Sequence, residues 1–109
     1  MTVDESTRRL IDQALQGSKL DLDRLLGTVQ DRVHALALRM LRNSEDARDA
    51  TQEILLRVAT RLDTFRHESS FSTWVHRVAA NHLLNVRRQQ AAIEPEAFRK
   101  RLSRARSLL

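Results

Sequence analysis

The chain has 109 residues, which is enough for one domain with one modest hydrophobic core. Hydrophobic residues make up 41% of it and charged residues 30%, a balance that excludes an intrinsically disordered chain. The net charge is +5, and the absence of cysteine excludes disulfides and thiolate zinc sites.

The positive charge is concentrated in the last third of the chain. Residues 1–75 hold 11 Lys or Arg against 12 acidic residues, a balance of −1, whereas residues 76–109 hold eight against two, a balance of +6. This asymmetry indicates contact with a polyanion, for which nucleic acid is the commonest candidate. A solvated basic tail is the alternative.

The sequence shows neither a membrane span nor a leader peptide. No apolar run approaches the roughly 18 residues that a bilayer-spanning helix needs. Residues 1–10 carry acids and arginines and lack the apolar segment of a signal peptide. We therefore expect a cytoplasmic protein with no membrane contact.

Apolar residues recur at helical spacing through most of the chain. The pattern predicts helices over residues 5–16, 21–42, 45–62 and 71–88, and Pro95 is suited to open a last basic helix with a stripe of Phe98, Leu102, Ala105 and Leu109. Only two glycines and one proline are present, so tight-turned strands are not expected. The predicted fold class is all-α, a small bundle of four to five helices.

Turn and cap residues separate these segments. Gly17 is predicted to end the first helix, and residues 63–70 and 89–93 read as a polar loop and a linker. The predicted N-caps are Asn43 or Ser44 before the third helix and Ser69 or Ser70 before the fourth.

Motifs typical of catalysis are missing from the sequence. It contains no phosphate-binding glycine loop, no His-Glu-x-x-His pair and no familiar arrangement around a nucleophilic serine or cysteine. The four histidines are scattered, at positions 34, 67, 76 and 82. We therefore expect no enzyme activity, no cofactor and no metal.

Three of the four aromatic residues, Phe65, Phe71 and Trp74, fall within ten positions of one another. Three arginines interleave with them: Arg61, Arg66 and Arg77. Unstacked bases bind on aromatic faces while cationic side chains hold the phosphates. The alternative is that Phe71 and Trp74 belong to the core. Phe65 lies in the polar loop and is the better candidate for base contact.

Two predicted helices carry polar faces. On the third helix, Asp49 and Glu53 follow Asp46 at i+3 and i+7, with Gln52 beside them, which indicates either a solvated face or docking onto a basic protein surface. The fourth helix holds Asn81, a mediocre helix former with a possible polar role, and ends in Arg87 and Arg88. These arginines suit the helix dipole as well as a phosphate.

These features occur in a recognisable order between residues 46 and 89. The motifs are Gln52-Glu53, Phe65-Arg66, a Ser-Phe-x-Thr-Trp helix start from Ser70 to Trp74, Ala80-Asn81 and Arg87-Arg88. The segment closely resembles region 2 of extracytoplasmic-function sigma factors. The resemblance implies that residues 1–90 form a helical domain that binds core RNA polymerase and melts the promoter −10 element.

The resemblance also implies roles for individual residues. The polymerase-binding positions, which would dock on the coiled coil of the β′ clamp, are Asp49, Gln52, Glu53 and Arg57. Phe65 and Asn81 would surround a base flipped from the non-template strand, and Arg77, Arg87 and Arg88 would hold phosphates. The complete set of implied DNA-binding positions is Arg61, Phe65, Arg66, Ser70, Phe71, Arg77, Asn81, Arg87 and Arg88. An anti-sigma factor is a further expected partner.

Residues 91–109 are expected to form a linker and a basic helix that resembles the end of the family's second domain, region 4. That domain would be lost from a natural protein or excised from a longer one, so no −35 contact is expected. One alternative function is a sigma-like interaction module that binds polymerase or an anti-sigma factor without reading DNA. Another is a duplex-DNA binder that uses Arg99, Arg101 and Arg104 in a major groove.

Overall fold

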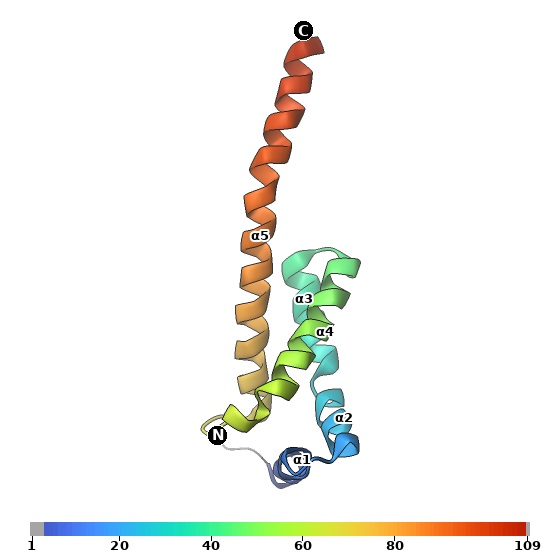
Figure 1. Cartoon of the computed structure of the whole chain (residues 1–109), viewed down its shortest axis with the longest axis vertical. Coiled ribbons are helices and arrows are strands. Elements are labelled where there is room, and N and C mark those ends of the chain that lie inside the picture. Colours follow the sequence, from blue (N-terminus) through green and yellow to red (C-terminus); the bar gives the residue numbers. More distant parts are fainter. Residues whose placement is uncertain (1–3, 109) are drawn as a thin grey trace.

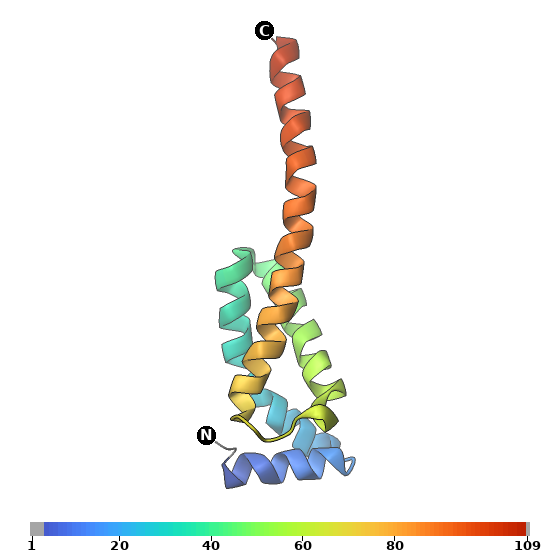
Figure 2. The same ribbon diagram turned by 90° about the vertical axis from the view of Figure 1, so that its left-hand side faces the viewer.

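The computed structural model describes the backbone of residues 4–108 and the side chains of residues 4–92 and 99–108. Over this range the chain is helical and contains no strand, which confirms the predicted all-α class. The elements are α1 (Glu5–Leu15), α2 (Lys19–Gly27), α3 (Gln30–Leu41), α4 (Ser44–Thr60), the 3-10 helix η1 (Leu62–Thr64) and α5 (Phe71–Leu108). Helices α3 and α4 lie side by side, α5 packs along both, and α1 lies across one end of the bundle (Figures 1 and 2).

One hydrophobic core joins these helices. Its side chains recur at helical spacing on the inward face of each helix, which is why the amphipathic pattern of the sequence is sufficient to build the bundle. Burial of each large aliphatic side chain contributes about 1.5–3 kcal/mol to folding. The buried residues include Ile11, Leu25, Val33, Ala37, Ala47, Ile54, Val58, Leu62, Val75, Ala79 and Leu83.

Side-chain caps fix where the helices begin. Asn43 Oδ1 accepts a hydrogen bond from the Asp46 amide at 2.9 Å, and Ser70 Oγ accepts one from the Thr73 amide at 3.1 Å. Of the predicted pairs, Asn43 and Ser70 therefore act as the N-caps. Gly17, at φ +102°, follows α1 in a left-handed conformation that suits glycine, as predicted.

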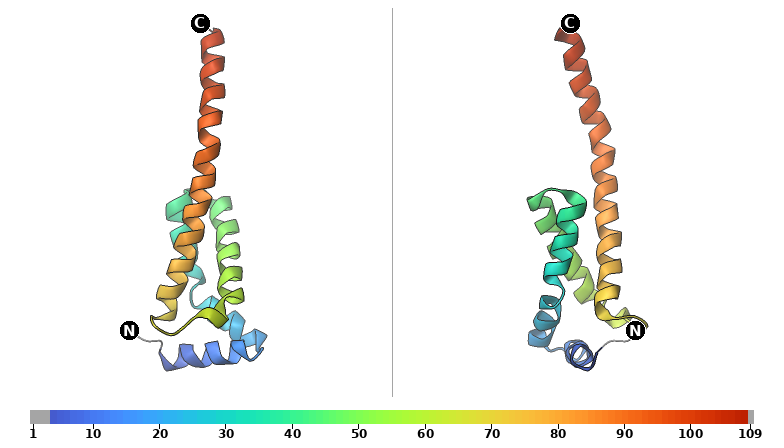
Figure 3. Two further views of the ribbon diagram at one scale, coloured as in Figure 1. Left: turned by 60° about the vertical axis from the view of Figure 1, so that its left-hand side comes forward. Right: turned by 180° about the vertical axis from the view of Figure 1, so that it is seen from behind.

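The prediction of a single helix over residues 21–42 is wrong. Helix α2 ends at Gly27 and α3 begins at Gln30. Glycine is a weak helix former, and Thr28 Oγ1 donates a hydrogen bond to the Leu25 carbonyl at 2.6 Å, which offers the backbone an alternative to helix. The break lets α2 pack against α1 while α3 packs against α4 (Figure 3).

The expected linker over residues 89–93 is also wrong as secondary structure, because α5 continues through it to Leu108. Glutamine and alanine, which occupy residues 89–92, are good helix formers, and they carry the helix forward although Pro95, inside α5, has no amide hydrogen to donate and disfavours helix. The end of α5 extends well beyond the bundle, and the molecule measures 67 × 25 × 19 Å (Figure 1). The predicted stripe members Phe98 and Leu109 lie outside the described side chains. The division into domains at residue 90 stays a prediction.

Even the long α5 is too polar to be a membrane span. In the part of the chain that the structure describes, no helix combines the length and the apolar character needed to cross a bilayer.

Candidate functional site

The loop between η1 and α5 is built around an aromatic cluster. Phe65 closes η1, and its ring centroid lies 5.9 Å from that of Phe71 and 5.2 Å from that of Trp74, both in the first turns of α5. The Phe65 and Phe71 rings meet edge to face, at 72°, an arrangement that the quadrupoles of aromatic rings favour. The cluster fixes the path of residues 65–70 over the end of the bundle.

Within this cluster Phe65 is buried, contrary to the expectation of an exposed loop aromatic. Its side chain is 7% exposed and that of Phe71 is 3% exposed, whereas Trp74 is half-buried. The polar residues around Phe65 indicated a solvent-facing loop, but burial of a phenyl ring against two other aromatics outweighs that local signal. In this conformation the indole of Trp74 is partly exposed to solvent, and the buried ring of Phe65 packs against it.

His67 belongs to the same cluster, although no sequence motif singled it out. Its ring centroid lies 4.6 Å from that of Phe65, and its backbone has φ +58°, a left-handed value that is uncommon outside glycine. Its buried Nδ1 has no hydrogen-bond partner among the described residues. A non-glycine residue in this backbone region stores local strain, a feature that clusters at binding sites.

The outer face of α5 brings three predicted DNA-binding residues together. Arg77, Asn81 and Arg88 are all exposed, and their spacing of four and seven residues places them on one side of the helix. Trp74 lies one turn before Arg77 on nearly the same side. The surface is therefore cationic, with an amide and a partly exposed indole at the end near the loop.

The remaining predicted DNA-binding residues divide into two groups. Arg61 and Arg66 are exposed at either end of η1, near the aromatic loop, whereas the hydroxyl of Ser70 is engaged in capping α5. Arg87 faces a different direction from Arg88. It lines a hollow of about 380 Å³ together with Arg39 and Arg42 at the end of α3. Sequence spacing alone could not reveal that these three arginines line the same hollow.

The exposed ridge of α4 carries the predicted polymerase-binding residues. Asp49 and Glu53 line a hollow between α4 and α5, and Gln52 lines another between α3 and α4. Arg57 is half-buried, and its Nε lies 3.6 Å from Glu53 Oε1 one turn earlier. Asp49, Gln52 and Glu53 are exposed and thus available to a partner, while Arg57 forms an ion pair with Glu53 on the same helix.

Leu56 is a candidate contact residue that sequence reasoning missed. It is 57% exposed on the same ridge, one turn beyond Gln52. The available signal was the adjacent pair Leu55-Leu56, because an amphipathic helix can direct only one of two neighbouring leucines toward its core. An exposed leucine among polar residues gives the ridge an apolar point of contact.

His82 faces this ridge from α5 and lines the same hollow as Asp49 and Glu53. Burial lowers the pKa of His82 below its ordinary value of 6.5, and the nearby Arg57 guanidinium lowers it further, while the Glu53 carboxylate opposes the shift. The imidazole is therefore neutral near pH 7. It does not offset the negative charge of the carboxylates on the ridge.

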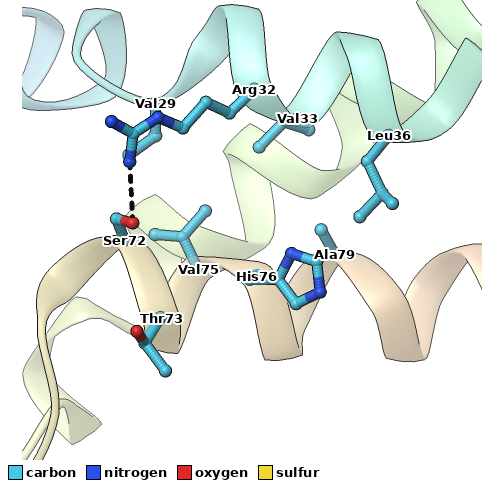
Figure 4. Close-up of a pocket in the computed structure, with 9 residues that line it drawn as sticks. All are labelled: Val29, Arg32, Val33, Leu36, Ser72, Thr73, Val75, His76 and Ala79. Carbon is cyan, nitrogen blue, oxygen red and sulfur yellow. Dashed lines mark hydrogen bonds between the residues drawn. The ribbon is translucent and has the colours of Figure 1, made fainter.

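A groove of about 250 Å³ separates α3 from the start of α5 (Figure 4). Apolar side chains, among them Val33 and Val75, form its floor, and Arg32 Nη1 donates a hydrogen bond to Ser72 Oγ at 2.8 Å across its end. This contact joins α3 to the first turn of α5, next to the aromatic loop. Residue types alone gave no indication of the pairing.

Comparison with known proteins assigns the chain to a family. The family model for Sigma-70 region 2 matches residues 25–93, which is more than half of the chain. The ECF RNA polymerase sigma factor SigE of Mycolicibacterium smegmatis is 36% identical over 70% of this chain and 29% of its own length. SigM of Mycobacterium tuberculosis is 31% identical over 86% of this chain and 47% of its own length.

The RNA polymerase sigma-H factor of Pseudomonas aeruginosa is 29% identical over 78% of this chain and 44% of its own length. The chain therefore spans less than half the length of these curated relatives. Among solved structures, it is similar to an engineered region 2 of sigmaE, determined by NMR in complex with GTAAAA. The TM-score is 0.71 at 28% identity, covering 81% of this chain and 94% of that one. These relatives are RNA polymerase sigma factors, two of them of the extracytoplasmic-function group, and the chain belongs to the Sigma-70 region 2 family.

Proposed function

We propose that this chain is the promoter-melting domain of a sigma factor, which binds core RNA polymerase and reads the −10 element as single-stranded non-template DNA. The aromatic loop and the outer face of α5 contact the DNA, and the ridge of α4 contacts the polymerase. The observation that carries the proposal is the similarity to a region 2 solved with GTAAAA, which extends over 94% of that chain.

The geometry of the α5 face supports the DNA-reading part of the proposal. Arg77 and Arg88 supply cations for phosphates, and Asn81 between them can donate and accept hydrogen bonds at a base edge. Flipping a base costs a few kcal/mol of unstacking, which stacking on an aromatic surface such as Trp74 offsets in part. The buried Phe65 and Phe71 hold that surface in place.

A labelled single strand containing GTAAAA, followed by fluorescence anisotropy, tests this part. We expect the wild type to bind this strand more tightly than a duplex of the same sequence. Asn81→Ala and Arg77→Gln should each weaken binding by about 1–3 kcal/mol, that is, roughly fivefold to 150-fold. Arg48→Gln, which removes the same charge from the exposed surface of α4, should have little effect. An equal loss in Arg48→Gln would show non-specific attraction instead of a reading surface.

The α4 ridge supports the polymerase part, because its carboxylates and the exposed Leu56 form a surface suited to a basic partner with an apolar pocket. Co-purification with the β′ clamp coiled coil tests it. We expect Gln52→Ala/Glu53→Ala to weaken capture. Asp12→Ala/Gln13→Ala, which likewise removes one carboxylate and one side-chain amide but from the exposed surface of α1, should not. Absence of capture by the wild type at micromolar concentration would contradict the proposal.

A second candidate function is an interaction module that binds polymerase or an anti-sigma factor without reading DNA. The burial of Phe65 and Phe71 favours it, because these rings are not available to a base in this conformation. The two functions predict different results for binding of the GTAAAA single strand. Clamp binding without any preference for the GTAAAA strand would support the interaction module. A polymerase partner places either activity in the cytoplasm.

A further inference from the structure

The continuity of α5 gives its arginines a common register. A helix turns about 100° per residue, so residues separated by seven or 11 positions return to the same side within about 20°. Arg88 follows Arg77 by 11 residues, Arg99 follows Arg88 by 11, and Arg106 follows Arg99 by seven. All four side chains are exposed. Together with Asn81 they form one line along α5, here called the arginine stripe.

The other cations at the end of α5 lie off this line. Arg101 and Arg104 are two and five residues after Arg99, which turns them by about 200° and 140° away from it. They are equally exposed and carry the same charge. The chain therefore provides a matched control within a single helix, because the same charge stands on the stripe and on the opposite side.

We propose that the distal part of the arginine stripe, Arg99 and Arg106, binds the phosphate backbone of duplex DNA next to the melted element that Arg77, Asn81 and Arg88 read. This inference rests on the proposed function, since the stripe is continuous with the proposed single-strand surface. Helix α5 would then span the junction between single-stranded and duplex promoter DNA.

Duplex phosphates fit the distal stripe better than a single strand does. Arg99 and Arg106 themselves supply charge but no aromatic surface, whereas sequence-tolerant binding of single strands relies on aromatic stacking. Arg99 and Arg106 are about 10 Å apart along the helix at 1.5 Å per residue, close to the roughly 12 Å width of a major groove. The two guanidiniums can therefore contact phosphates on opposite sides of one groove.

The length of the helix sets the position of the contact. Arg99 is 18 residues beyond Asn81, which corresponds to about 27 Å along α5, or about eight base pairs at 3.4 Å each. A duplex arm shorter than this would not reach the distal stripe. The inference thus predicts a dependence on arm length that uniform electrostatic attraction would not produce.

The experiment compares three probes by fluorescence anisotropy: the GTAAAA single strand alone, the strand extended into a short arm of about four base pairs, and the strand extended into a long arm of about 15. Two series place the arm at either end of the strand. We expect the wild type to bind the long-arm probe about tenfold more tightly than the single strand in one of the series. The short-arm probe should show almost no gain.

Two double variants carry the decisive comparison. Arg99→Gln/Arg106→Gln should cancel the gain from the long arm and leave binding of the single strand unchanged. It should also lower the slope of log affinity against log salt concentration by about 2, since two phosphate contacts are lost. Arg101→Gln/Arg104→Gln removes the same charge from the opposite side and should retain most of the gain.

Insertions after Ala92 test the register without changing any charge. Two inserted alanines rotate the distal arginines by about 200°, and four rotate them by about 400°, which is only 40° beyond a full turn. We expect the two-residue insertion to cancel the long-arm gain and the four-residue insertion to keep it. Circular dichroism checks that both insertions remain helical.

The outcomes separate this inference from the function on which it rests. Binding of the single strand with no gain from the long arm would overturn the inference and leave the proposed function standing. Equal losses in the two double variants, or a gain that survives the two-residue insertion, would also overturn it. If the wild type bound none of the probes, the proposed function itself would fail, and the inference with it.

Discussion

Gln90 Nε2 donates a hydrogen bond to Asp46 Oδ2 at 3.1 Å, although the two residues are 44 positions apart. Asp46 lies in the first turn of α4, and Gln90 is partly buried, whereas Ala91, Ala92 and residues 99–108 of α5 are exposed. The end of α5 extends beyond the bundle (Figure 1). The bond therefore anchors the last turn of α5 that rests on the body of the molecule. The extended part of α5 takes its direction from this turn.

Removing this anchor should loosen the junction without unfolding the bundle. We expect Gln90→Ala to lower the free energy of unfolding by about 1 kcal/mol, the usual contribution of one partly buried hydrogen bond. Amide exchange around residues 86–92 should become faster, because opening of these turns would no longer break a tertiary contact. Gln89→Ala, at an exposed neighbouring position, is the control. Equal effects of both substitutions would argue against an anchoring role.

Two adjacent leucines on α5 should differ greatly in their contribution to stability. Leu83 is fully buried, whereas Leu84 is 41% exposed. Leu83→Ala should cost about 2–5 kcal/mol, since it removes buried methyl groups and leaves a cavity. Leu84→Ala should change stability by no more than about 0.5 kcal/mol. Urea denaturation followed by circular dichroism measures both values, and similar midpoints would contradict the packing described for α5.

Stability should fall in mildly acidic solution because of His82. Its folded pKa is below 6.5, chiefly because of burial, so between that value and pH 6.5 the unfolded chain binds more protons than the folded one. The stabilising contribution of the neutral imidazole is therefore complete above about pH 6.5 and decreases as the pH falls.

Thermal melting between about pH 7.5 and pH 5 tests this expectation. The variant His82→Gln should lose less stability over this interval than the wild type. His34→Gln, at an exposed position on α3, should follow the wild type. The role of His82 is refuted if the melting temperatures of wild type and His82→Gln decline in parallel.

Leu56 should contribute to clamp binding if the α4 ridge is the docking surface. Because its side chain is 57% exposed, Leu56→Ala should leave the unfolding free energy nearly unchanged. Burial of this side chain at an interface should be worth about 1 kcal/mol, so the variant should bind the clamp coiled coil roughly fivefold more weakly. Leu20→Ala, which truncates a leucine with 61% exposure on α2, is the control for apolar surface in general. If Leu56→Ala and Leu20→Ala bound the clamp coiled coil with the same affinity, Leu56 would not be part of the docking surface.

The sequence was a good guide wherever an apolar stripe faced a core. Ile54 and Val58 on α4, and Val75 and Ala79 on α5, recur at the helical spacing from which these helices were predicted, and all four are buried. An apolar stripe cannot predict a helix where the helix has no neighbour to pack against. Residues 89–93 lack an apolar stripe, and their helical conformation follows from propensity and from continuity with the packed turns before them.

Side-chain direction was the part of the candidate site that the sequence could not supply. Phe65 lies in a polar segment, so its local context suggested exposure, whereas tertiary packing against Phe71 and Trp74 buries it. Arg87 and Arg88 are neighbours in sequence, yet Arg87 lines a hollow with residues of α3 and Arg88 lies on the outer face of α5. Such differences depend on which helices become neighbours, and that is decided by the whole chain.

The crossing of α1 and α5 has a consequence for how the molecule moves in solution. Helix α5 runs along the 67 Å axis, while α1 lies across it (Figure 2). An elongated particle spins quickly about its long axis and tumbles slowly end over end. Helical N–H bonds are parallel to the helix axis, so those of α5 are reoriented only by the slow tumbling, and those of α1 also by the fast spinning. Two equally rigid helices in one small protein will therefore show different transverse relaxation rates in NMR, and the difference measures the angle between them.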